Sequence, residues 1–442
     1  MKRIFALLIS AIMIVSLFAA CGQGGGTSSS DGGNTSSSSG GGKTTVEFWG
    51  HVNEAWNASH RDIVGRFNAS QSEIEVVPTF FPYDDFEAKI QTSLMAGGAG
   101  ADIYEIWGGW GLDFVATDAL SPVPDAVIKE LIADSYEPVL GTFKKGDTYY
   151  GVPVEYNNEY GGMLVNKVEF DKLGIPYPET WDEIVNVARQ TSVSNGPVFE
   201  MRGLDFTTDD TLTHTFLTTI LSTGGQYWVN DKFDFSTPQA TQALQMLVDL
   251  IVVDNVTNLD SATGAQGAEI DGAHFLGRGE AMMVPRGPWV ISMLEEEYDK
   301  AEGVDFEFVK FPIYGPTKAF TAETGWSMCV PKNTQVAEAA WEYLDFFLDK
   351  ENLMEHNVRC AQIPPLKSIA KDPEFAKQLP FVVPLLDILD AGRFIGPFNT
   401  DVLKIGLRNV FVSLCTQDGT YASVSEALTS LENELNTTLK LG

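Results

Sequence analysis

The chain has 442 residues, which exceeds one ordinary domain and is enough for two lobes with separate cores. A hydrophobic fraction of 44% and an aromatic fraction of 11% are those of a folded protein, and they exclude a wholly disordered or fibrous chain. The formal charge of −31 excludes nucleic acid as a partner, because phosphates would be repelled.

The N-terminal segment predicts a membrane anchor. Lys2 and Arg3 precede an apolar run that ends at Ala20, which is the order of a secretory signal peptide. Small residues stand directly before Cys21, and this arrangement resembles a bacterial lipobox. We therefore expect residues 1–20 to be a lipoprotein signal peptide and Cys21 to carry lipid. A plain signal peptide followed by a chance cysteine is the alternative.

A flexible tether is predicted after the cysteine. Gly, Ser and Thr supply 18 of the 22 residues from 22 to 43, so this segment cannot bury a core. We expect residues 21–43, the lipidated cysteine and its tether, to hold a folded domain away from the membrane surface.

Strand and helix patterns alternate from Thr44 onward. Val46 and Phe48 alternate with polar residues and predict a strand that ends at Trp49. Periodicity then predicts these elements in chain order: a helix over 55–68, a strand over 74–81, a helix over 86–95 and a strand over 103–106. This alternation within about 60 residues predicts a parallel α/β sheet.

Helix signals continue through the second half of the chain. Thr180 and Glu183 form a capping box at the start of one helix. Pro238 opens another helix, in which apolar residues recur at helical spacing as far as Ile251. Further apolar periodicity predicts a helix over 336–348 and a last helix that carries Leu428, Leu431 and Leu435. The sequence therefore predicts an α/β protein throughout.

Motifs of enzyme chemistry are missing from the sequence. The five histidines show no metal-ligand spacing, and neither a GxSxG elbow nor a GxGxxG loop after a strand occurs. We therefore expect no metal and no cofactor. Carboxylates are so abundant that their number alone leaves a glycosidase pair open. Cys329 and Cys360 are expected to be buried thiols, with a disulfide between them as the open alternative.

Five tryptophans indicate a ligand site because each lies at a strand end or beside glycine. They are Trp49, Trp107, Trp110, Trp289 and Trp326. Open α/β sheets bind ligands at the carboxyl ends of their strands. Aromatic faces there suit the apolar faces of sugar rings, whose hydroxyls bond to carboxylates and amides. Ordinary core packing is the alternative, and it is the expected role of Trp181 and Trp341.

Several short segments, in their order and spacing, resemble one family along nearly the whole chain after the tether. They include Val46-Glu47-Phe48-Trp49, Ala96-Gly97-Gly98-Ala99-Gly100-Ala101-Asp102-Ile103, Gly151-Val152-Pro153-Val154, Leu164-Val165-Asn166-Lys167, Pro178-Glu179-Thr180-Trp181-Asp182-Glu183, Gly279-Glu280-Ala281-Met282-Met283 and Gly287-Pro288-Trp289. The chain resembles extracellular solute-binding proteins of bacterial ABC importers, in the carbohydrate class related to maltose-binding protein.

The resemblance implies a periplasmic-binding-protein-like fold, with two discontinuous α/β lobes and a hinge. The first lobe is expected at 44–154 and 314–366, and the second at 155–313 and 367–442. A sugar or oligosaccharide would lie in the cleft between them, and hinge closure would present it to the transmembrane permease subunits. The protein would be a monomer that catalyses no reaction, lipid-anchored on the extracytoplasmic face of the cell membrane.

The resemblance also implies particular ligand contacts. Trp289 matches a cleft-facing tryptophan of a Gly-Pro-Trp motif. Glu159 lies seven residues before Asn166, at the offset of a sugar-binding glutamate, with Glu155 as its alternative. The remaining implied contacts follow strand ends or return segments: Trp49, His51, Asp84 or Asp85, Trp107, Trp326 and Arg393. Trp110 is also a predicted ligand contact, because it stands beside glycine.

Two other functions remain open at this point. A secreted glycoside hydrolase would share the aromatic cleft and the acidic character. A binding protein for a non-sugar solute, such as a peptide, would share the fold. An anionic solute would need a basic cleft, and the excess of acidic residues argues against one.

Overall fold

The computed structural model describes residues 42–96, 100–264 and 272–438. Lys43–Gly442 forms one compact unit. The predicted signal peptide, Cys21 and the tether lie outside the described residues, apart from Gly42 and Lys43. In the described part of the chain, no helix combines the length and the apolarity needed to cross a membrane.

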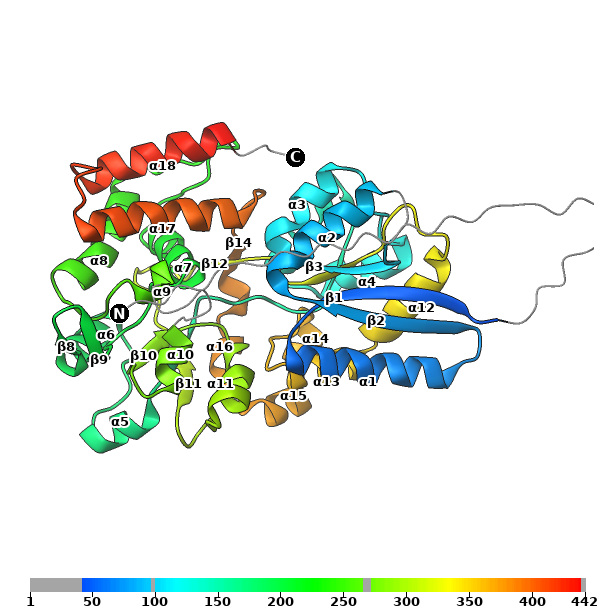
Figure 1. Ribbon diagram of the computed structural model, residues 1–442, viewed down its shortest axis with the longest axis horizontal. Coiled ribbons are helices and arrows are strands. Elements are labelled where there is room, and N and C mark those ends of the chain that lie inside the picture. Colours follow the sequence, from blue (N-terminus) through cyan, green and yellow to red (C-terminus); the bar gives the residue numbers. More distant parts are fainter. Residues whose placement is uncertain (1–41, 97–99, 265–271, 439–442) are drawn as a thin grey trace, which may run out of the picture. The chain divides into compact units, whose positions relative to one another are not determined.

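A five-stranded sheet with the order β2-β1-β3-β13-β6 organises the first core (Figure 1). Its strands are β1 Thr44–His51, β2 Ile74–Phe81, β3 Ile103–Ile106, β6 Val152–Pro153 and β13 Ser327–Cys329. β1 runs parallel to β2 and β3, as predicted, with Val46 opposite Val76. β13 runs antiparallel to both β3 and β6. The sequence did not predict this strand, because three residues carry too little periodicity.

Four helices belong to this part of the chain, and the sequence predicted all of them except the last. They are α1 Glu54–Ser70, α2 Tyr83–Met95, α12 Ala337–Leu348 and α13 Lys350–Arg359. α1 packs against β2, α12 and α13. It begins after Asn53, whose side chain accepts a hydrogen bond from the Trp56 backbone N–H at 3.2 Å. The buried residues of this first core come from 46–154 and 326–369.

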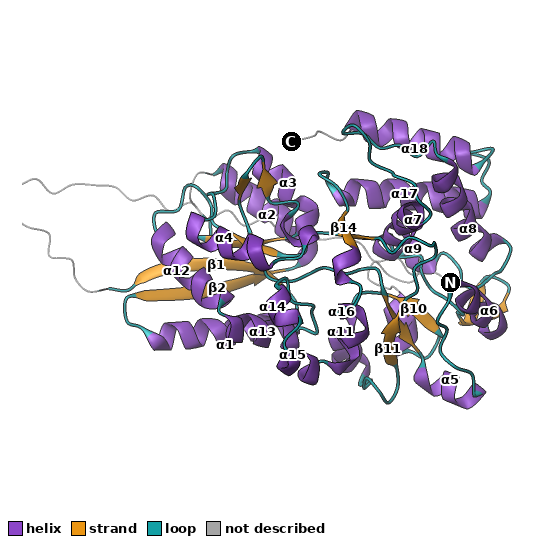
Figure 2. Cartoon of the chain, turned by 180° about the vertical axis from the view of Figure 1, so that it is seen from behind, coloured by secondary structure: helices purple, strands orange, loops and turns teal. Residues whose placement is uncertain are grey.

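A second, antiparallel sheet has β7 between β10 and β11. Its two outer strands, β10 and β11, are labelled in Figure 2. Its strands are β7 Gly162–Val165, β10 Met283–Pro285 and β11 Glu307–Lys310. The long helices of this region are α6 Trp181–Thr191, α7 Asp209–Ser222, α8 Pro238–Val252, α17 Thr400–Thr416 and α18 Val424–Thr438. α7 packs on α8 and α17, and α17 packs on α18. The capping box at Thr180 and the proline at the start of α8 are both present.

Shorter elements connect these parts. The strands are β4 Lys144–Lys145, β5 Thr148–Tyr149, β8 Val193–Asn195, β9 Val198–Met201, β12 Phe320–Ala322 and β14 Gly392–Phe394. The helices are α3 Gly108–Ala116, α4 Asp125–Asp134, α5 Lys167–Leu173, α9 Asp260–Thr263, α10 Gly272–Gly277, α11 Val290–Tyr298, α14 Lys367–Ala370, α15 Pro373–Gln378 and α16 Val383–Leu386. Three 3₁₀ turns cover Glu137–Leu140, Pro380–Val382 and Leu389–Ala391. These elements confirm the predicted α/β class.

Cysteines and helical tryptophans take interior positions. Cys329 and Cys360 are free and buried, and burial raises the pKa of both thiols well above its ordinary value. Cys415 is free and partly buried. Trp181 packs in the second core, and Trp341 is a partly buried residue beside the first. Both positions are those predicted for core tryptophans.

Candidate functional site

Four chain segments meet at one edge of the first sheet. β1 ends at His51, β3 is followed by Trp107, and β6 is followed by Val154 and Glu155. These three strands run in one direction, so their carboxyl ends lie at the same edge. Trp326 stands directly before the antiparallel strand β13 and therefore reaches that edge as well.

A cavity of about 360 Å³ opens at this edge. Its volume lies in the range of roughly 300–1,000 Å³ that is usual for small-ligand sites. The lining residues are His51, Asn53, Trp56, Tyr83, Trp107, Glu155, Asn157, Glu159, Asp210, Trp289, Trp326, Gln362, Asp401 and Lys404. The strand ends of the first sheet supply one side, and the first turns of α7 and α17 contribute to the other.

Aromatic rings form the first side, which we call the aromatic wall: His51, Trp56, Tyr83, Trp107 and Trp326. Trp326 is its centre. The His51 ring stacks on the Trp326 indole, with 4.0 Å between centroids and 5° between planes. The rings of Trp107 and Tyr83 lie 5.6 and 6.1 Å from that of Trp326. The wall thus presents flat apolar surfaces with polar edges.

A buried carboxylate supports the aromatic wall from behind. Glu105 Oε2 lies 2.9 Å from His51 Nδ1, and Glu105 Oε1 lies 3.0 Å from His60 Nε2. Burial alone would raise the pKa of Glu105, but electrostatic attraction to His60 and His51 and hydrogen bonds from both rings hold it well below its ordinary value. Glu105 is therefore ionised although no solvent reaches it.

The opposite side, which we call the ionic wall, consists of Glu159, Asp210, Trp289 and Lys404. The Lys404 ammonium lies 2.9 Å from Asp210 Oδ1 and donates a hydrogen bond to Glu323 Oε2 at 3.0 Å. Burial would lower the pKa of Lys404, but the charges of Asp210 and Glu323 raise it well above its ordinary value. Burial opposes ionisation of Glu323 too, yet Lys404 lowers its pKa to about 2. This cluster is held as ions.

Arg286 joins Trp289 and Glu159 to the same wall. Trp289 Nε1 donates to Glu159 Oε1 at 2.8 Å, and Arg286 Nη1 donates to Asp210 Oδ2 at 3.0 Å. The Arg286 guanidinium also lies 4.7 Å from the centre of the Trp289 ring. Burial and the charge of Asp210 raise the pKa of Glu159, with Arg286 acting against them.

Glu155 differs from the acids of the ionic wall. Its Oε1 accepts the backbone N–H of Trp326 at 3.1 Å, and no lysine or arginine among the described residues forms an ion pair with it. Burial, chiefly, raises its pKa to about 8. Gly325 permits the close approach, since a Cβ there would lie 2.5 Å from Glu155 Oε1. At neutral pH this side chain is a carboxylic acid with a proton to donate.

Two polar atoms around the cavity are buried and have no hydrogen-bond partner among the described residues. They are Trp107 Nε1, a donor, and Asn157 Oδ1, an acceptor. Both residues line the cavity. A buried polar atom without a partner costs free energy, so a ligand with hydroxyl groups would be favoured here.

The structure brings five of the nine predicted ligand residues to the cavity: His51, Trp107, Glu159, Trp289 and Trp326. Trp110 lies behind it, and its Nε1 donates to Asp401 Oδ2 at 3.0 Å. Trp49 contacts the rings of Phe81 and Tyr104 instead.

Of the last two predicted contacts, Arg393 does not line the cavity, and Asp84 is not tested. Arg393 lies in β14, where its guanidinium donates to the backbone carbonyls of Asp390 and Gly392. Asp84 belongs to the first turn of α2, and its side chain lies outside what the structure describes.

Sequence reasoning missed several lining residues: Asn53, Trp56, Asn157, Asp210, Gln362, Asp401 and Lys404. Asp210 and Asp401 stand in the first turns of α7 and α17, where acidic residues are common for reasons unrelated to ligands. Lys404 sits one turn further along α17, with no local signal. Asn53 carried a signal, since it caps α1 directly after the first strand.

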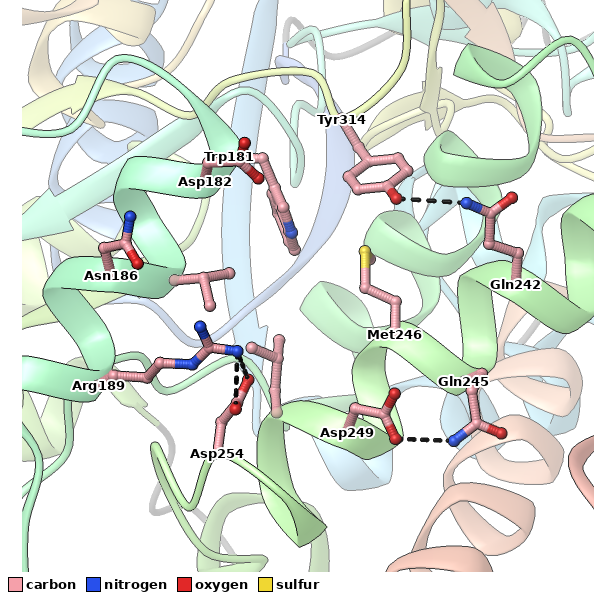
Figure 3. A pocket seen from close by; sticks show the side chains of 12 residues that line it. Trp181, Asp182, Asn186, Arg189, Gln242, Gln245, Met246, Asp249, Asp254 and Tyr314 are labelled. Carbon is pink, nitrogen blue, oxygen red and sulfur yellow. Dashed lines mark hydrogen bonds and ion pairs between the residues drawn. The ribbon is translucent and has the colours of Figure 1, made fainter.

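A second cavity, of about 600 Å³, lies between α6 and α8 and differs in character (Figure 3). Its polar side chains already pair with one another. Arg189 binds Asp254 at 2.8 Å, and the Gln245 amide donates to Asp249 at 2.8 Å. No orphaned buried polar atom is recorded among its lining residues. We therefore take the cavity between the aromatic and ionic walls as the candidate site.

Comparison with known proteins identifies a family and several relatives of this chain. A family model described as "Bacterial extracellular solute-binding protein" matches residues 53–354. The multiple sugar-binding protein of Streptococcus mutans is 24% identical over 272 residues, or 60% of this chain and 62% of that protein. The arabinooligosaccharide-binding protein of Halalkalibacterium halodurans is 26% identical over 191 residues, or 42% and 41%. These matches span less than two thirds of the relatives' lengths.

A solved structure of similar fold is maltose-bound T. maritima MalE3. It has a TM-score of 0.71 and 20% identity, and the match covers 89% of this chain and 99% of that one. This likeness confirms the predicted fold type. Among the residues that the structure describes, no cluster of histidine, cysteine and carboxylate side chains could hold a metal ion.

Proposed function

The chain belongs to the family of bacterial extracellular solute-binding proteins, and on that premise we propose that it captures a sugar or oligosaccharide for an ABC importer. The carrying observation is the aromatic wall, in a cavity whose lining also includes two polar atoms that lack partners among the described residues. Indole faces stack on the C–H faces of sugar rings, and the unpaired polar atoms suit hydroxyls. The family consists of binding proteins rather than enzymes, so we expect the sugar to leave unchanged.

The charges around the cavity support a neutral ligand. Lys404 is the one lysine or arginine in the lining, whereas four carboxyl side chains line it. Lys404 already forms ion pairs with Asp210 and Glu323. An anionic ligand would find no available cation among the lining residues and would be repelled. The named relatives, a multiple sugar-binding protein and an arabinooligosaccharide-binding protein, support a carbohydrate.

A sugar panel tests the ligand class. Thermal unfolding should be measured with maltose, maltotriose and arabino-oligosaccharides, and with a peptide and a sugar phosphate as contrasts. A ligand at 100 times its Kd stabilises by about 2.7 kcal/mol, which gives a clear shift in Tm. Chromatography of the incubated sugar separates binding from hydrolysis. Stabilisation by the peptide alone, or turnover of the sugar, would contradict the proposal.

We place the first lobe at 44–154 and 314–366, and the second at 155–313 and 367–442. The separate sheets support this division, and the first core draws on 46–154 and 326–369. The second core also includes Tyr136, Val139, Phe320 and Ala322, so the chain passes between the two cores near these residues. Closing contacts would join α3 to the start of α17, where Trp110 donates to Asp401. Hinge closure on a sugar predicts a smaller radius of gyration in small-angle scattering. An unchanged radius at saturating ligand would argue against closure.

The anchor proposal rests on the sequence before Lys43. Lipid on Cys21 would hold the protein on the extracytoplasmic face of the membrane, beside the permease subunits that receive the sugar. Cys21→Ser should release the protein from membranes without altering sugar affinity, because the tether separates the anchor from the fold. A variant that stays with washed membranes would exclude the lipid anchor. Light scattering of the released protein should give the mass of a monomer.

A further inference from the structure

Glu105 occupies an unusual place beneath the candidate site. It lies in β3 at the centre of the first sheet, and its side chain is fully buried. Its carboxylate contacts three nitrogen atoms: His51 Nδ1 at 2.9 Å, the His51 backbone N–H at 3.3 Å and His60 Nε2 at 3.0 Å. Glu105 does not line the cavity itself, so any effect on a ligand must pass through His51.

His51 is the residue through which Glu105 reaches the cavity. The ring is packed on two sides, flat against Trp326 at 4.0 Å and edge-on to Trp56 at 5.1 Å. Its Nδ1 is taken by Glu105, whereas no described residue bonds to its Nε2. Because His51 lines the cavity and Nε2 is not a buried orphan, this nitrogen is the ring's polar edge toward a ligand.

An ionised carboxylate can only accept hydrogen bonds. A neutral imidazole carries one proton, on either Nδ1 or Nε2. The short contact with Glu105 therefore requires the proton of His51 on Nδ1 and leaves a lone pair on Nε2. The same reasoning requires the proton of His60 on Nε2, which leaves His60 Nδ1 as a buried acceptor without a partner among the described residues.

We propose that Glu105 is a positioning residue: it holds the His51 ring flat against Trp326 with the proton on Nδ1, so that Nε2 accepts a hydrogen bond from a ligand hydroxyl. The nature of that hydroxyl rests on the proposed sugar-binding function, whereas the proton position does not. The arrangement selects a ligand with a hydrogen-bond donor at this point. A sugar methylated or deoxygenated at that hydroxyl is rejected.

The test begins with the unaltered protein and no ligand. Long-range ¹H–¹⁵N spectra distinguish a protonated from an unprotonated ring nitrogen, and His51→Asn assigns the signals by their loss. We expect a protonated Nδ1 and an unprotonated Nε2. A His51 ring that carries a proton on Nε2, with or without one on Nδ1, overturns the proposal, whatever the ligand proves to be.

Two variants then separate positioning from a merely structural role. Glu105→Met keeps a side chain of similar length without acceptors, and we expect His51 to populate both proton positions and maltose affinity to fall about tenfold. Glu75→Gln, on an exposed site of β2, is the matched control and should change neither. A folded Glu105→Met protein with unaltered His51 signals overturns the proposal.

The last part of the test records the His51 signals with maltose present. At saturation it should move the Nε2 signal of His51 and leave Nδ1 in place, and maltose that binds without moving Nε2 overturns the acceptor role. If maltose does not bind, the sugar of the panel that stabilises the protein replaces it as the probe, and failure of every sugar would contradict the proposed function instead. The ligand-free spectrum still decides the role of Glu105.

Discussion

Glu155, beside the aromatic wall, and Glu323, which pairs with Lys404 of the ionic wall, are similarly buried, yet they ionise differently. Glu155 is nearly inaccessible, and burial raises its pKa to about 8. Glu323, equally inaccessible, has a pKa of about 2 because Lys404 lies 3.0 Å from its Oε2 and outweighs the effect of burial. Glu105 shows that the partner matters more than the region, since two histidines keep it ionised. Of these three buried acids, only the two that a cation or an imidazole touches are charged.

The strongest test of this comparison removes the cation. Lys404→Met leaves Glu323 and Asp210 without their ammonium, and we expect a loss of about 3–5 kcal/mol in the free energy of unfolding at pH 7. Urea denaturation measures it, with Lys129→Met on the exposed face of α4 as the control. The pKa of Glu323 is lowered from 4.5 to about 2, so its contribution is present above pH 4.5. It is lost as the pH falls toward 2, and the difference between variant and wild type should shrink there.

Glu155→Gln tests the acid that lacks a cation. The folded protein keeps a proton on Glu155 that the unfolded chain releases above pH 4.5. Wild-type stability should therefore fall as the pH rises from 4.5 to about 8, at up to about 1.4 kcal/mol per pH unit from this group. Glutamine removes that slope, so the variant's relative stability should grow to a few kcal/mol at pH 8. Parallel stability profiles from pH 5 to 8, with Glu130→Gln as control, would refute the raised pKa.

Trp289→Ala asks whether the ionic wall also supplies an aromatic face to the ligand. We expect affinity for the bound sugar to fall by about 2–3 kcal/mol, or roughly 30- to 150-fold, as a stacked ring and its apolar area are lost. Calorimetry measures affinity and stability together. Trp341→Ala, away from the cavity, should lower stability alone. Normal affinity in Trp289→Ala would remove this residue from the site.

Trp107→Phe should give the smallest loss of sugar affinity, and it tests a single hydrogen-bond donor. The indole Nε1 has no partner among the described residues, so its loss should leave unliganded stability nearly unchanged. If that donor bonds a sugar hydroxyl, affinity should fall by about 1 kcal/mol, or roughly fivefold. Trp110→Phe is the contrast, because its Nε1 already donates to Asp401 and its loss should lower stability instead. Equal affinity losses in the two variants would contradict the distinction.

Local patterns predicted the fold best where elements are long. The alternation at Val46 and Phe48, the capping box at Thr180 and the proline of α8 each predicted an element that the structure contains. β6 and β13 were beyond such patterns, because strands of two and three residues have no measurable period. Their pairing is decided by contacts between residues far apart in the sequence.

The site was partly predictable for a related reason. Trp107 and Trp326 follow or precede strands at the ligand-binding edge, and glycine beside each marked them. Trp49 shares those marks, yet it contacts Phe81 and Tyr104, since alternate residues of a strand point to opposite faces. No local sequence pattern indicated Lys404, because its role depends on the carboxylates that folding places around it.

The position of β13 has a consequence for how the chain reaches this structure. β13 lies between β3 and β6, although it begins at Ser327, after the whole second sheet has been synthesised. A growing chain that lacks this strand leaves β3 and β6 without their shared neighbour, with backbone groups open to wrong pairings. Such distant contacts slow folding. Completion of the N-terminal core must therefore wait for the last third of the polypeptide, and folding cannot proceed simply from the first residue to the last.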